Sequence, residues 1–239
     1  MRIVVIIQAR MGSTRLPGKV LQDLGGQTVL ERVVSRTRRC GLVNEVIVAT
    51  SVNPADDAIV EACVPLRVRV FRGSEHDVLD RYFRAAEAAQ AEVVVRITCD
   101  CPLIDPGVSD KTICAFLDAR PDYASNVLER TYPRGLDTEV VALEALECAF
   151  REAQEPFQRE HVTPFFYLHR EKFKLLSVKG EHDFSQHRWT LDTAEDLEFL
   201  QAVYARLGDR DFNWQDVLRL MENEPKLAEI NRGAVQKTV

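Results

Sequence analysis

The sequence lacks any apolar run that approaches the length of a membrane span. The short apolar stretch after Arg2 meets the polar residues Gln8 and Arg10 too early for a signal peptide. We therefore expect a cytoplasmic protein with no membrane partner. A basic excess is also missing, because 31 Lys and Arg residues face 37 Asp and Glu residues and the formal net charge is −6. Proteins that coat nucleic acid are normally basic, so we expect no nucleic-acid partner, although a few focused cations can still bind a small anion.

Paired cysteines are lacking as well. Of the six cysteines, only Cys99 and Cys101 lie near each other, and one C-x-C pair is not a zinc-binding pattern. We expect all six to be reduced and packed as small apolar side chains. No internal repeat or domain linker is visible, and 46% hydrophobic with 28% charged residues is typical of a folded globule. We expect one domain over residues 1–225 and a polar tail that frays over 226–239.

Apolar β-branched runs alternate with helical patterns over the first half of the chain. Strands are expected at residues 3–7, 45–50, 67–71 and 92–98, with helices from residue 28 and over 54–63 and 77–90. Thr28 and Glu31 form a T-x-x-E capping box, which marks the start of the first helix. This alternation predicts an α/β fold with a mostly parallel sheet flanked by helices.

The pattern becomes irregular after residue 120. Short strands are expected at 123–126, 136–141, 173–178 and 187–191, and helices at 143–153, 158–168, 194–207 and 213–223. Pro164 makes the helix at 158–168 short or kinked. We expect a small irregular β/α insertion at about 120–175.

The strongest functional pattern follows the first strand, in residues 9–19 (A-R-M-G-S-T-R-L-P-G-K). Ligands of open α/β sheets bind beyond the carboxyl ends of the strands, which is where this loop begins. Gly12 lets the backbone approach a phosphate, and Ser13 offers a hydroxyl and an N–H donor. The loop is therefore a candidate phosphate-binding site.

Three cations, Arg10, Arg15 and Lys19, lie on this one loop. They repel each other unless an anion is bound, which favours a polyphosphate ligand. The loop is not a Walker A motif, because Val20 stands where Ser or Thr is required. The alternative interpretation is an ordinary solvated basic loop.

The loop resembles the A-R-x-G-S-x-R-x-x-x-K motif of the cytidylyltransferases that activate sugar acids, such as the keto-deoxy-octulosonate and acylneuraminate enzymes. Segments at 73–82 (G-S-E-H-D-V-L-D-R-Y), 132–140 (Y-P-R-G-L-D-T-E-V) and 159–164 (R-E-H-V-T-P) are more similar to the spore-coat polysaccharide (SpsF-like) branch. The likeness spans roughly residues 1–205. It implies a Rossmann-like fold of the nucleotide-diphospho-sugar transferase or glycosyltransferase-A type. It also implies that the loop from Ala9 onward binds the nucleotide.

Two aspartates are candidate metal ligands. Asp100 ends the fourth strand and points into the same crevice as the phosphate loop, and Mg²⁺ prefers such oxygen ligands. The resemblance gives Asp100 and Asp192 this role. The structural alternatives are that Asp100 caps a turn and that Asp192 caps the next helix, although Thr193 and Asp196 supply a T-x-x-D cap pattern of their own. Cys99 stands where the family often has Gly or Ala, which leaves close approach of the nucleotide there open.

Two further groups of residues follow from the resemblance. Gly73, Asp77 and Arg81 face the base and ribose in relatives, with Asp77 or backbone groups on the cytosine amino group and Arg81 on a base carbonyl or a phosphate. The alternative is a helix capped by Asp77 with a solvated Arg81. The second group is a candidate acceptor pocket, in which an arginine suits a carboxylate or a phosphate. Its members are Arg134, Asp137, Glu139, Arg159 and His161.

The resemblance implies transfer of CMP from CTP to a small acidic or phosphorylated sugar, with Mg²⁺ as cofactor and pyrophosphate as product, in surface polysaccharide biosynthesis. It also implies a homodimer that associates through the region at about 120–175. Three alternatives stay open: a nucleotidyltransferase that uses another NTP, a glycosyltransferase, and a non-catalytic nucleotide-binding module. A glycosyltransferase would need a D-x-D motif, which only Asp77-x-x-Asp80 approximates. The pattern does not identify the acceptor sugar.

Overall fold

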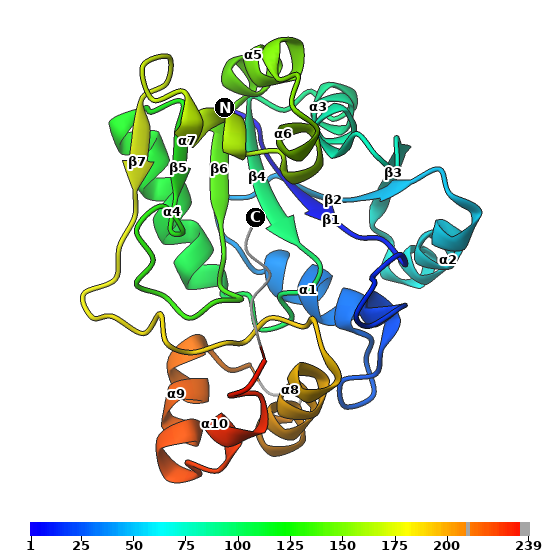
Figure 1. The fold of residues 1–239 in the computed structure, drawn as a ribbon, viewed down its shortest axis with the longest axis vertical. Helices are drawn as coiled ribbons and strands as arrows, with labels where there is room; N and C mark the ends of the chain where they lie inside the picture. The colour runs from blue at the N-terminus through cyan, green and yellow to red at the C-terminus, as the bar shows by residue number, and fades with distance from the viewer. Residues whose placement is uncertain (209–210, 235–239) are drawn as a thin grey trace.

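The computed structural model of the protein describes residues 1–208 and 211–234. Its centre is one seven-stranded sheet with the strand order β3-β2-β1-β4-β6-β5-β7 (Figure 1). Only β6 runs antiparallel to its neighbours, so the sheet is mostly parallel, as the alternating pattern predicts. The strands are β1 (Ile3–Gln8), β2 (Glu45–Ser51), β3 (Arg69–Gly73), β4 (Val93–Thr98), β5 (Tyr123–Ser125), β6 (Glu139–Ala142) and β7 (Leu175–Ser177).

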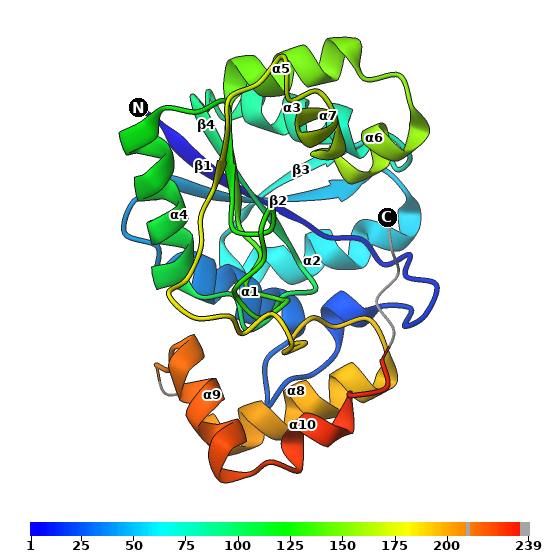
Figure 2. The ribbon, with the colours of Figure 1, turned by 60° about the vertical axis from the view of Figure 1, so that its left-hand side comes forward.

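Helices cover both faces of this sheet. Figure 2 shows α3, α5, α6 and α7 on one face and α1, α2 and α4 on the other. The first group is α3 (Val78–Ala88), α5 (Leu143–Glu152), α6 (Pro156–His161) and α7 (Pro164–Leu168). The second group is α1 (Val29–Thr37), α2 (Asp57–Leu66) and α4 (Pro106–Ala119), with short 3₁₀ turns at Lys19–Leu21 and Pro54–Asp56.

The two faces are built by alternation along each strand. In β1, Val5 and Ile7 pack into the core beneath α1, α2 and α4, whereas Val4 and Ile6 pack into the core beneath α3, α5 and α7. Successive side chains of a strand point to opposite faces, so a continuous apolar run fills both cores. The capping box predicted at Thr28 and Glu31 is present at the start of α1.

The last three helices pack together at one end of the molecule (Figure 1). They are α8 (Ala194–Leu207), α9 (Trp214–Asn223) and α10 (Leu227–Ile230), and all three contribute to a third apolar core. Leu227 is buried at 3% exposure and Asn231 at 6%. The expectation of a fraying tail from residue 226 is therefore wrong for residues 226–231, because α10 and Asn231 pack against the folded domain. Residues 235–239 of the expected tail lie outside the described residues.

Two other expectations need correction. The helix expected at 158–168 is two short helices, α6 and α7, separated at Val162, which has φ 71° and ψ −54°. The N–H of Thr163 donates to the carbonyl of His161 at 2.8 Å, which closes a strained γ-turn, and Pro164 then starts α7 because it has no N–H to continue α6. Residues 187–191 form no strand, and only an isolated bridge pairs Arg188 with Arg134.

Candidate active site

A cavity of about 420 Å³ lies where β1 and β4 end. Parallel strands that neighbour each other bring their carboxyl ends to one edge of the sheet, which is why the phosphate loop and Asp100 meet there. The predicted residues that line the cavity are Arg10, Gly12, Ser13, Arg15, Lys19, Asp100, Arg134, Asp137, His161 and Asp192. Ala9 is buried in the core behind the loop.

The phosphate loop is fixed by the buried carboxylate of Asp56. Asp56 Oδ1 accepts a hydrogen bond from the N–H of Met11 at 2.7 Å, and its Oδ2 accepts from the N–H of Ser51 at 3.1 Å. An added Cβ on Gly12 would meet no atom within 4 Å. The backbone at Gly12 is therefore held from behind and open on the side of the cavity, as a site for a bulky anion requires.

Lys19 joins the two predicted metal ligands. Its Nζ donates to Asp100 Oδ2 at 2.8 Å, to Asp192 Oδ1 at 2.9 Å and to the carbonyl of Leu191 at 2.8 Å. Burial acts to lower the pKa of Lys19, but the two carboxylates raise it above its ordinary value. Burial acts to raise the pKa of Asp100, and the ammonium of Lys19 brings it down to about 2. Lys19 and Asp100 are consequently both charged at neutral pH.

The same geometry suits a divalent cation. Asp100 and Asp192 direct one oxygen each toward a single cationic point, the Nζ of Lys19, and both are hard oxygen donors of the kind that Mg²⁺ prefers. Within residues 1–208 and 211–234, no group of three or more His, Cys, Asp and Glu side chains has the geometry of a metal site. The protein thus offers two carboxylates, which fits Mg²⁺ that takes its other ligands from phosphates and water.

Asp192 is oriented by Arg188 and Asp196, which the sequence patterns did not single out for a function, and by Arg15 of the phosphate loop. Arg188 Nη2 lies 2.9 Å from Asp192 Oδ2 and 2.8 Å from Asp196 Oδ2. Arg15 Nη2 lies 3.1 Å from Asp192 Oδ2. The capping box of Thr193 and Asp196 is present, so Asp192 is not the helix cap and its carboxylate faces the cations. The T-x-x-D pattern is the only local sequence feature that indicates a role for Asp196, as a helix cap, and no local feature indicates a role for Arg188.

The segment that carries Asp192 is attached directly to the end of β4. The N–H of Leu191 donates to the carbonyl of Asp100 at 2.8 Å, and Thr190 Oγ1 donates to the same carbonyl at 3.1 Å. Gly135 packs against this segment so closely that an added Cβ would lie 2.7 Å from the carbonyl carbon of Trp189. The two metal-ligand candidates therefore belong to one rigid unit, although they are far apart in sequence.

The residues expected around the base do not line this cavity. Asp77 caps α3 by accepting from the N–H of Asp80 at 2.9 Å. Arg81 is fully buried, which excludes the solvated alternative, and its Nη1 donates to the carbonyl of Ser74 at 2.7 Å. Its Nε and Nη2 have no hydrogen-bond partner in the part of the chain that the structure describes. A Cβ on Gly73 would lie 3.1 Å from Arg81 Cγ, so the glycine lets the loop close over this arginine.

The expected acceptor residues divide into two groups. Glu139 is buried and pairs with Arg96 at 3.0 Å, and Arg159 pairs with Asp77, so neither lies free at the cavity. Asp137 reaches the cavity but is held by both terminal nitrogens of Arg130, at 2.5 and 2.8 Å.

Arg134 is different. The structure shows no hydrogen bond or ion pair of its guanidinium with any described residue, and burial together with the nearby cations lowers its pKa. It is thus a half-buried guanidinium that lines the cavity and forms no ion pair with a described residue.

Three other polar residues of the cavity, Gln8, Thr98 and Thr190, were not assigned a function from the sequence. Gln8 ends β1 and its Oε1 is buried without a partner among the described residues. Glu160 lines the cavity and its carboxylate lies 3.9 Å from Arg10 Nη2. Thr98 and Thr190 complete this group. Gln8 and Thr98 could have been predicted as cavity residues, because each is a polar side chain at the carboxyl end of a central strand.

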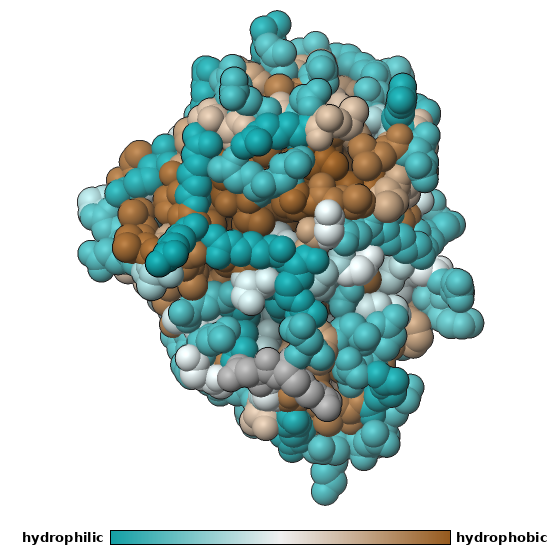
Figure 3. All heavy atoms as spheres, turned by 180° about the vertical axis from the view of Figure 1, so that it is seen from behind, coloured by the Kyte–Doolittle hydropathy of each residue, from teal (hydrophilic) through white to brown (hydrophobic). Residues whose placement is uncertain are grey.

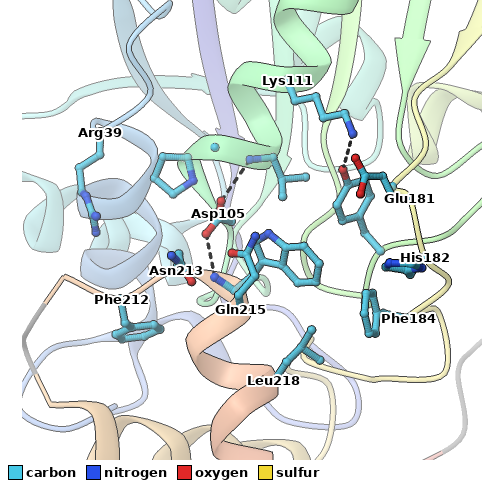
Figure 4. A pocket seen from close by; sticks show the side chains of 16 residues that line it. Arg39, Asp105, Lys111, Glu181, His182, Phe184, Phe212, Asn213, Gln215 and Leu218 are labelled. Atoms are coloured by element: carbon cyan, nitrogen blue, oxygen red, sulfur yellow. Dashed lines mark hydrogen bonds between the residues drawn. The ribbon is translucent and has the colours of Figure 1, made fainter.

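A second cavity, of about 690 Å³, lies between α4, α9 and the segment at 180–184 (Figure 4). None of the predicted functional residues lines it. Two carboxylates, Asp105 and Glu181, line it. Asp105 caps the starts of α4 and α9, because its Oδ1 accepts from the N–H of Val108 and its Oδ2 from the N–H of Trp214. Lys111 Nζ donates to Tyr132 Oη at 3.1 Å. Its charged groups thus serve helix capping and packing, and the smaller cavity is the active-site candidate.

The model of a family described as cytidylyltransferase matches residues 4–224. The chain belongs to the cytidylyltransferase family. It is accordingly a nucleotidyltransferase, and this agrees with the fold and with the A-R-x-G-S-x-R-x-x-x-K loop. No helix of the described residues is long and apolar enough to cross a membrane.

Individual members of this cytidylyltransferase family are similar over nearly the whole chain. The spore coat polysaccharide biosynthesis protein SpsF of Bacillus subtilis is 37% identical over 234 residues, which cover 95% of this chain and 96% of that protein. A solved cytidylyltransferase structure from Leptospira borgpetersenii has a TM-score of 0.92 and 34% identity, and covers 100% of this chain and 99% of its own. The 3-deoxy-manno-octulosonate cytidylyltransferase of Geobacter sulfurreducens is 39% identical over 120 residues, which cover 49% of this chain and 46% of that enzyme.

Proposed function

We propose that the protein transfers CMP from CTP to an acidic or phosphorylated sugar and releases pyrophosphate. The observation that carries this proposal is the shared cavity in which Lys19 of the phosphate loop contacts both Asp100 and Asp192. A nucleotidyl transfer needs cations for the leaving pyrophosphate and carboxylates for a metal ion within one site. Family membership and the similarity to sugar-acid cytidylyltransferases support cytosine as the base.

In this mechanism an oxygen of the acceptor attacks the α-phosphorus, and the bond from the α-phosphorus to the bridging oxygen of pyrophosphate breaks. The protein contributes position and charge, because such transfers need little covalent chemistry from the enzyme. Arg10, Arg15 and Lys19 bind the β- and γ-phosphates and stabilise the negative charge of the leaving group. Asp100 and Asp192 would hold Mg²⁺, which when bound neutralises phosphate charge and lowers the pKa of a nearby hydroxyl.

Arg134 is the residue that we assign to the anionic group of the acceptor. Its guanidinium lies at the cavity without a counter-ion among the described residues, and a planar fork of donors matches a carboxylate or a phosphate. A neutral sugar would leave this partly desolvated cation uncompensated, which is energetically unfavourable. The acceptor is therefore an anion.

We also propose a role in surface polysaccharide biosynthesis in the cytoplasm, and a homodimer. The polysaccharide role is supported by the similarity to the spore coat protein of Bacillus subtilis. For the dimer, α6 and α7 expose the large apolar side chains Phe157, at 41%, and Leu168, at 52%. An apolar band also crosses the face shown in Figure 3. Exposed apolar surface of either kind favours association with another protein.

The alternatives have less support. In a glycosyltransferase the Asp77-x-x-Asp80 pair would have to bind a metal, but Asp77 is a helix cap that is held by Arg159. A non-catalytic binding module has no need for two carboxylates beside the phosphate loop. A nucleotidyltransferase specific for another NTP is the alternative that the first experiment must address.

That experiment measures the melting temperature with CTP, ATP, GTP and UTP, each with and without Mg²⁺. A ligand that binds only the folded state raises the melting temperature. The largest rise is expected with CTP and Mg²⁺ together, followed by pyrophosphate release when an acidic or phosphorylated sugar is added. A larger rise with another nucleotide would contradict the proposed specificity for cytosine. The absence of a rise with any nucleotide would contradict the proposed nucleotidyl transfer.

A further inference from the structure

The segment after α9 reaches back to the catalytic centre. Asn231 follows α10 and is only 6% exposed. Its side-chain nitrogen, Nδ2, donates to the carbonyl of Arg188 at 3.0 Å and to Asp196 Oδ1 at 2.9 Å. An amide nitrogen carries two hydrogens, so both donors of Asn231 are used on the segment that carries Asp192.

Asp196 is the centre of this arrangement. Its carboxylate is fully buried and accepts on both oxygens. Oδ1 accepts from Arg188 Nε and Asn231 Nδ2, each at 2.9 Å. Oδ2 accepts from Arg188 Nη2 at 2.8 Å and from the N–H groups of Asp192 at 2.9 Å and Thr193 at 3.1 Å. A carboxylate with this many donors has one orientation, so Asp196 fixes the backbone of Asp192 and the plane of Arg188.

Arg188 passes this orientation on to Asp192. Its Nη2 binds Asp192 Oδ2 at 2.9 Å, which leaves Oδ1 directed at Lys19 Nζ and, beyond it, at Asp100. One oxygen of the proposed metal ligand is therefore anchored and the other is presented to the cation. A ligand held in this way loses little conformational freedom on binding a metal ion.

We propose that Asn231 is a positioning residue of the metal site, and that it acts on Asp192 through Asp196 and Arg188. This inference rests on the proposed binding of Mg²⁺ by Asp100 and Asp192. Asparagine suits the position because its two N–H donors meet a carbonyl oxygen and a carboxylate oxygen. Aspartate has almost the same shape but offers only acceptors at neutral pH, and it would face both oxygens with like charge.

The competing explanation is that Asn231 merely anchors the C-terminal segment. Packing alone would be preserved by the nearly isosteric change Asn231→Asp, apart from a loss of stability. A positioning role instead predicts weaker metal binding in a protein that is still folded. Removal of a residue that orients a metal ligand typically weakens metal affinity about 10-fold to 100-fold.

The test titrates Mn²⁺ into the full-length protein with CTP and follows the free ion by electron paramagnetic resonance, below the melting temperature of every variant. We expect Asn231→Asp and Asn231→Ala to weaken Mn²⁺ binding at least about 10-fold, with the aspartate variant weaker than the alanine variant. Arg188→Lys, which keeps the charge but loses the planar fork, is expected to show the same loss. The matched control is Asn213→Ala, which removes the asparagine cap of α9 and its hydrogen bond to Asp216, away from the active-site cavity.

Wild-type affinity in both Asn231 variants would overturn the positioning role. The same loss in Asn213→Ala would also overturn it, since the effect would then follow from general destabilisation. If the wild-type protein itself binds no Mn²⁺ in the presence of CTP, the proposed metal-dependent function fails, and this outcome is distinct from a failure of Asn231 alone.

Discussion

Arg159 and Asp77 form a two-nitrogen ion pair across 82 residues of sequence, with Nε 3.0 Å and Nη2 2.5 Å from Asp77 Oδ2. Arg159 Nη1 also donates to the carbonyl of Phe150 at 2.6 Å. The pair connects α6, whose last two residues line the active-site cavity, to the capped start of α3. The placement of Glu160 and His161 at the cavity thus depends on an ion pair that lies outside it.

The ion pair of Arg159 and Asp77 predicts a measurable coupling. We expect a double-mutant cycle of Arg159→Ala and Asp77→Asn to give a coupling energy of about 1 kcal/mol in urea unfolding, because both side chains are partly buried. Arg159→Lys is expected to lose most of it, since an ammonium does not reproduce the fork. Additive effects of the two substitutions would contradict the structural role.

Lys19 and Asp100 are predicted to be essential for turnover. Lys19→Ala removes a cation from the leaving group, and Asp100→Asn removes a carboxylate from the metal site. Each is expected to lower pyrophosphate release at least about 100-fold while the protein stays folded in circular dichroism. Lys172→Ala is the control, because it removes a lysine that pairs with Glu152 on the surface. Near-normal turnover in either active-site variant would overturn the assignment.

The low pKa of Asp100 predicts a specific loss of stability in acid. The folded state holds the ionised form, since the pKa falls from 3.8 to about 2. This contribution is therefore present above about pH 4 and is lost as the pH falls toward 2. Across this window the free energy of unfolding of the wild type should fall more steeply than that of Asp100→Asn, measured with urea at several pH values. The same slope in both proteins would refute the charged pairing, and Asp118→Asn on the exposed side of α4 serves as control.

Gly135 is predicted to tolerate no side chain. Its φ is 110° and an added Cβ would lie 2.7 Å from the carbonyl oxygen of Trp189. Gly26 is the control position. It has φ 85°, but an added Cβ there would meet nothing within 4 Å, so a substitution at Gly26 measures the backbone strain without a steric clash. Gly26→Ala is expected to cost about 1 kcal/mol of stability, and Gly135→Ala clearly more together with a loss of activity. Equal costs in thermal unfolding would show that the segment at 187–191 can move away.

Arg134 is predicted to determine affinity for the acceptor. In Arg134→Ala the KM for the sugar should rise about 10-fold or more, while the KM for CTP stays within about twofold, because the charged side chains that act on Arg134 lie outside the phosphate loop. Steady-state measurements with each substrate varied in turn provide this comparison. A rise in the KM for CTP alone would place Arg134 on the nucleotide instead.

The features that the sequence predicts correctly are those with a local signal. The β-branched run of β1, the capping box of Thr28 and Glu31, and the loop after the first strand each depend on neighbours within a few residues. The meeting of Asp100 with the phosphate loop follows from one topological rule, since β1 and β4 are parallel neighbours.

The remaining features depend on partners that are distant in sequence. The segment at 187–191 has the composition of a strand, but Trp189 and Leu191 donate their backbone hydrogen bonds to Arg134 and Asp100 instead of to a neighbouring strand. The sequence predicts Arg81 either on the nucleotide or in solvent, whereas the loop that closes at Gly73 buries it. No spacing pattern in the sequence relates Asn231 to Asp196, because tertiary packing decides which carboxylate Asn231 binds.

The bridge from Lys19 to Asp100 and Asp192 means that the protein carries its own counter-ion for the two carboxylates of the proposed metal site. Two carboxylates without any cation would repel each other and push the segments that carry them apart. With the ammonium between them, treatment with a chelator should leave the site assembled. Activity should then return within the mixing time when Mg²⁺ is restored, without a slow refolding phase.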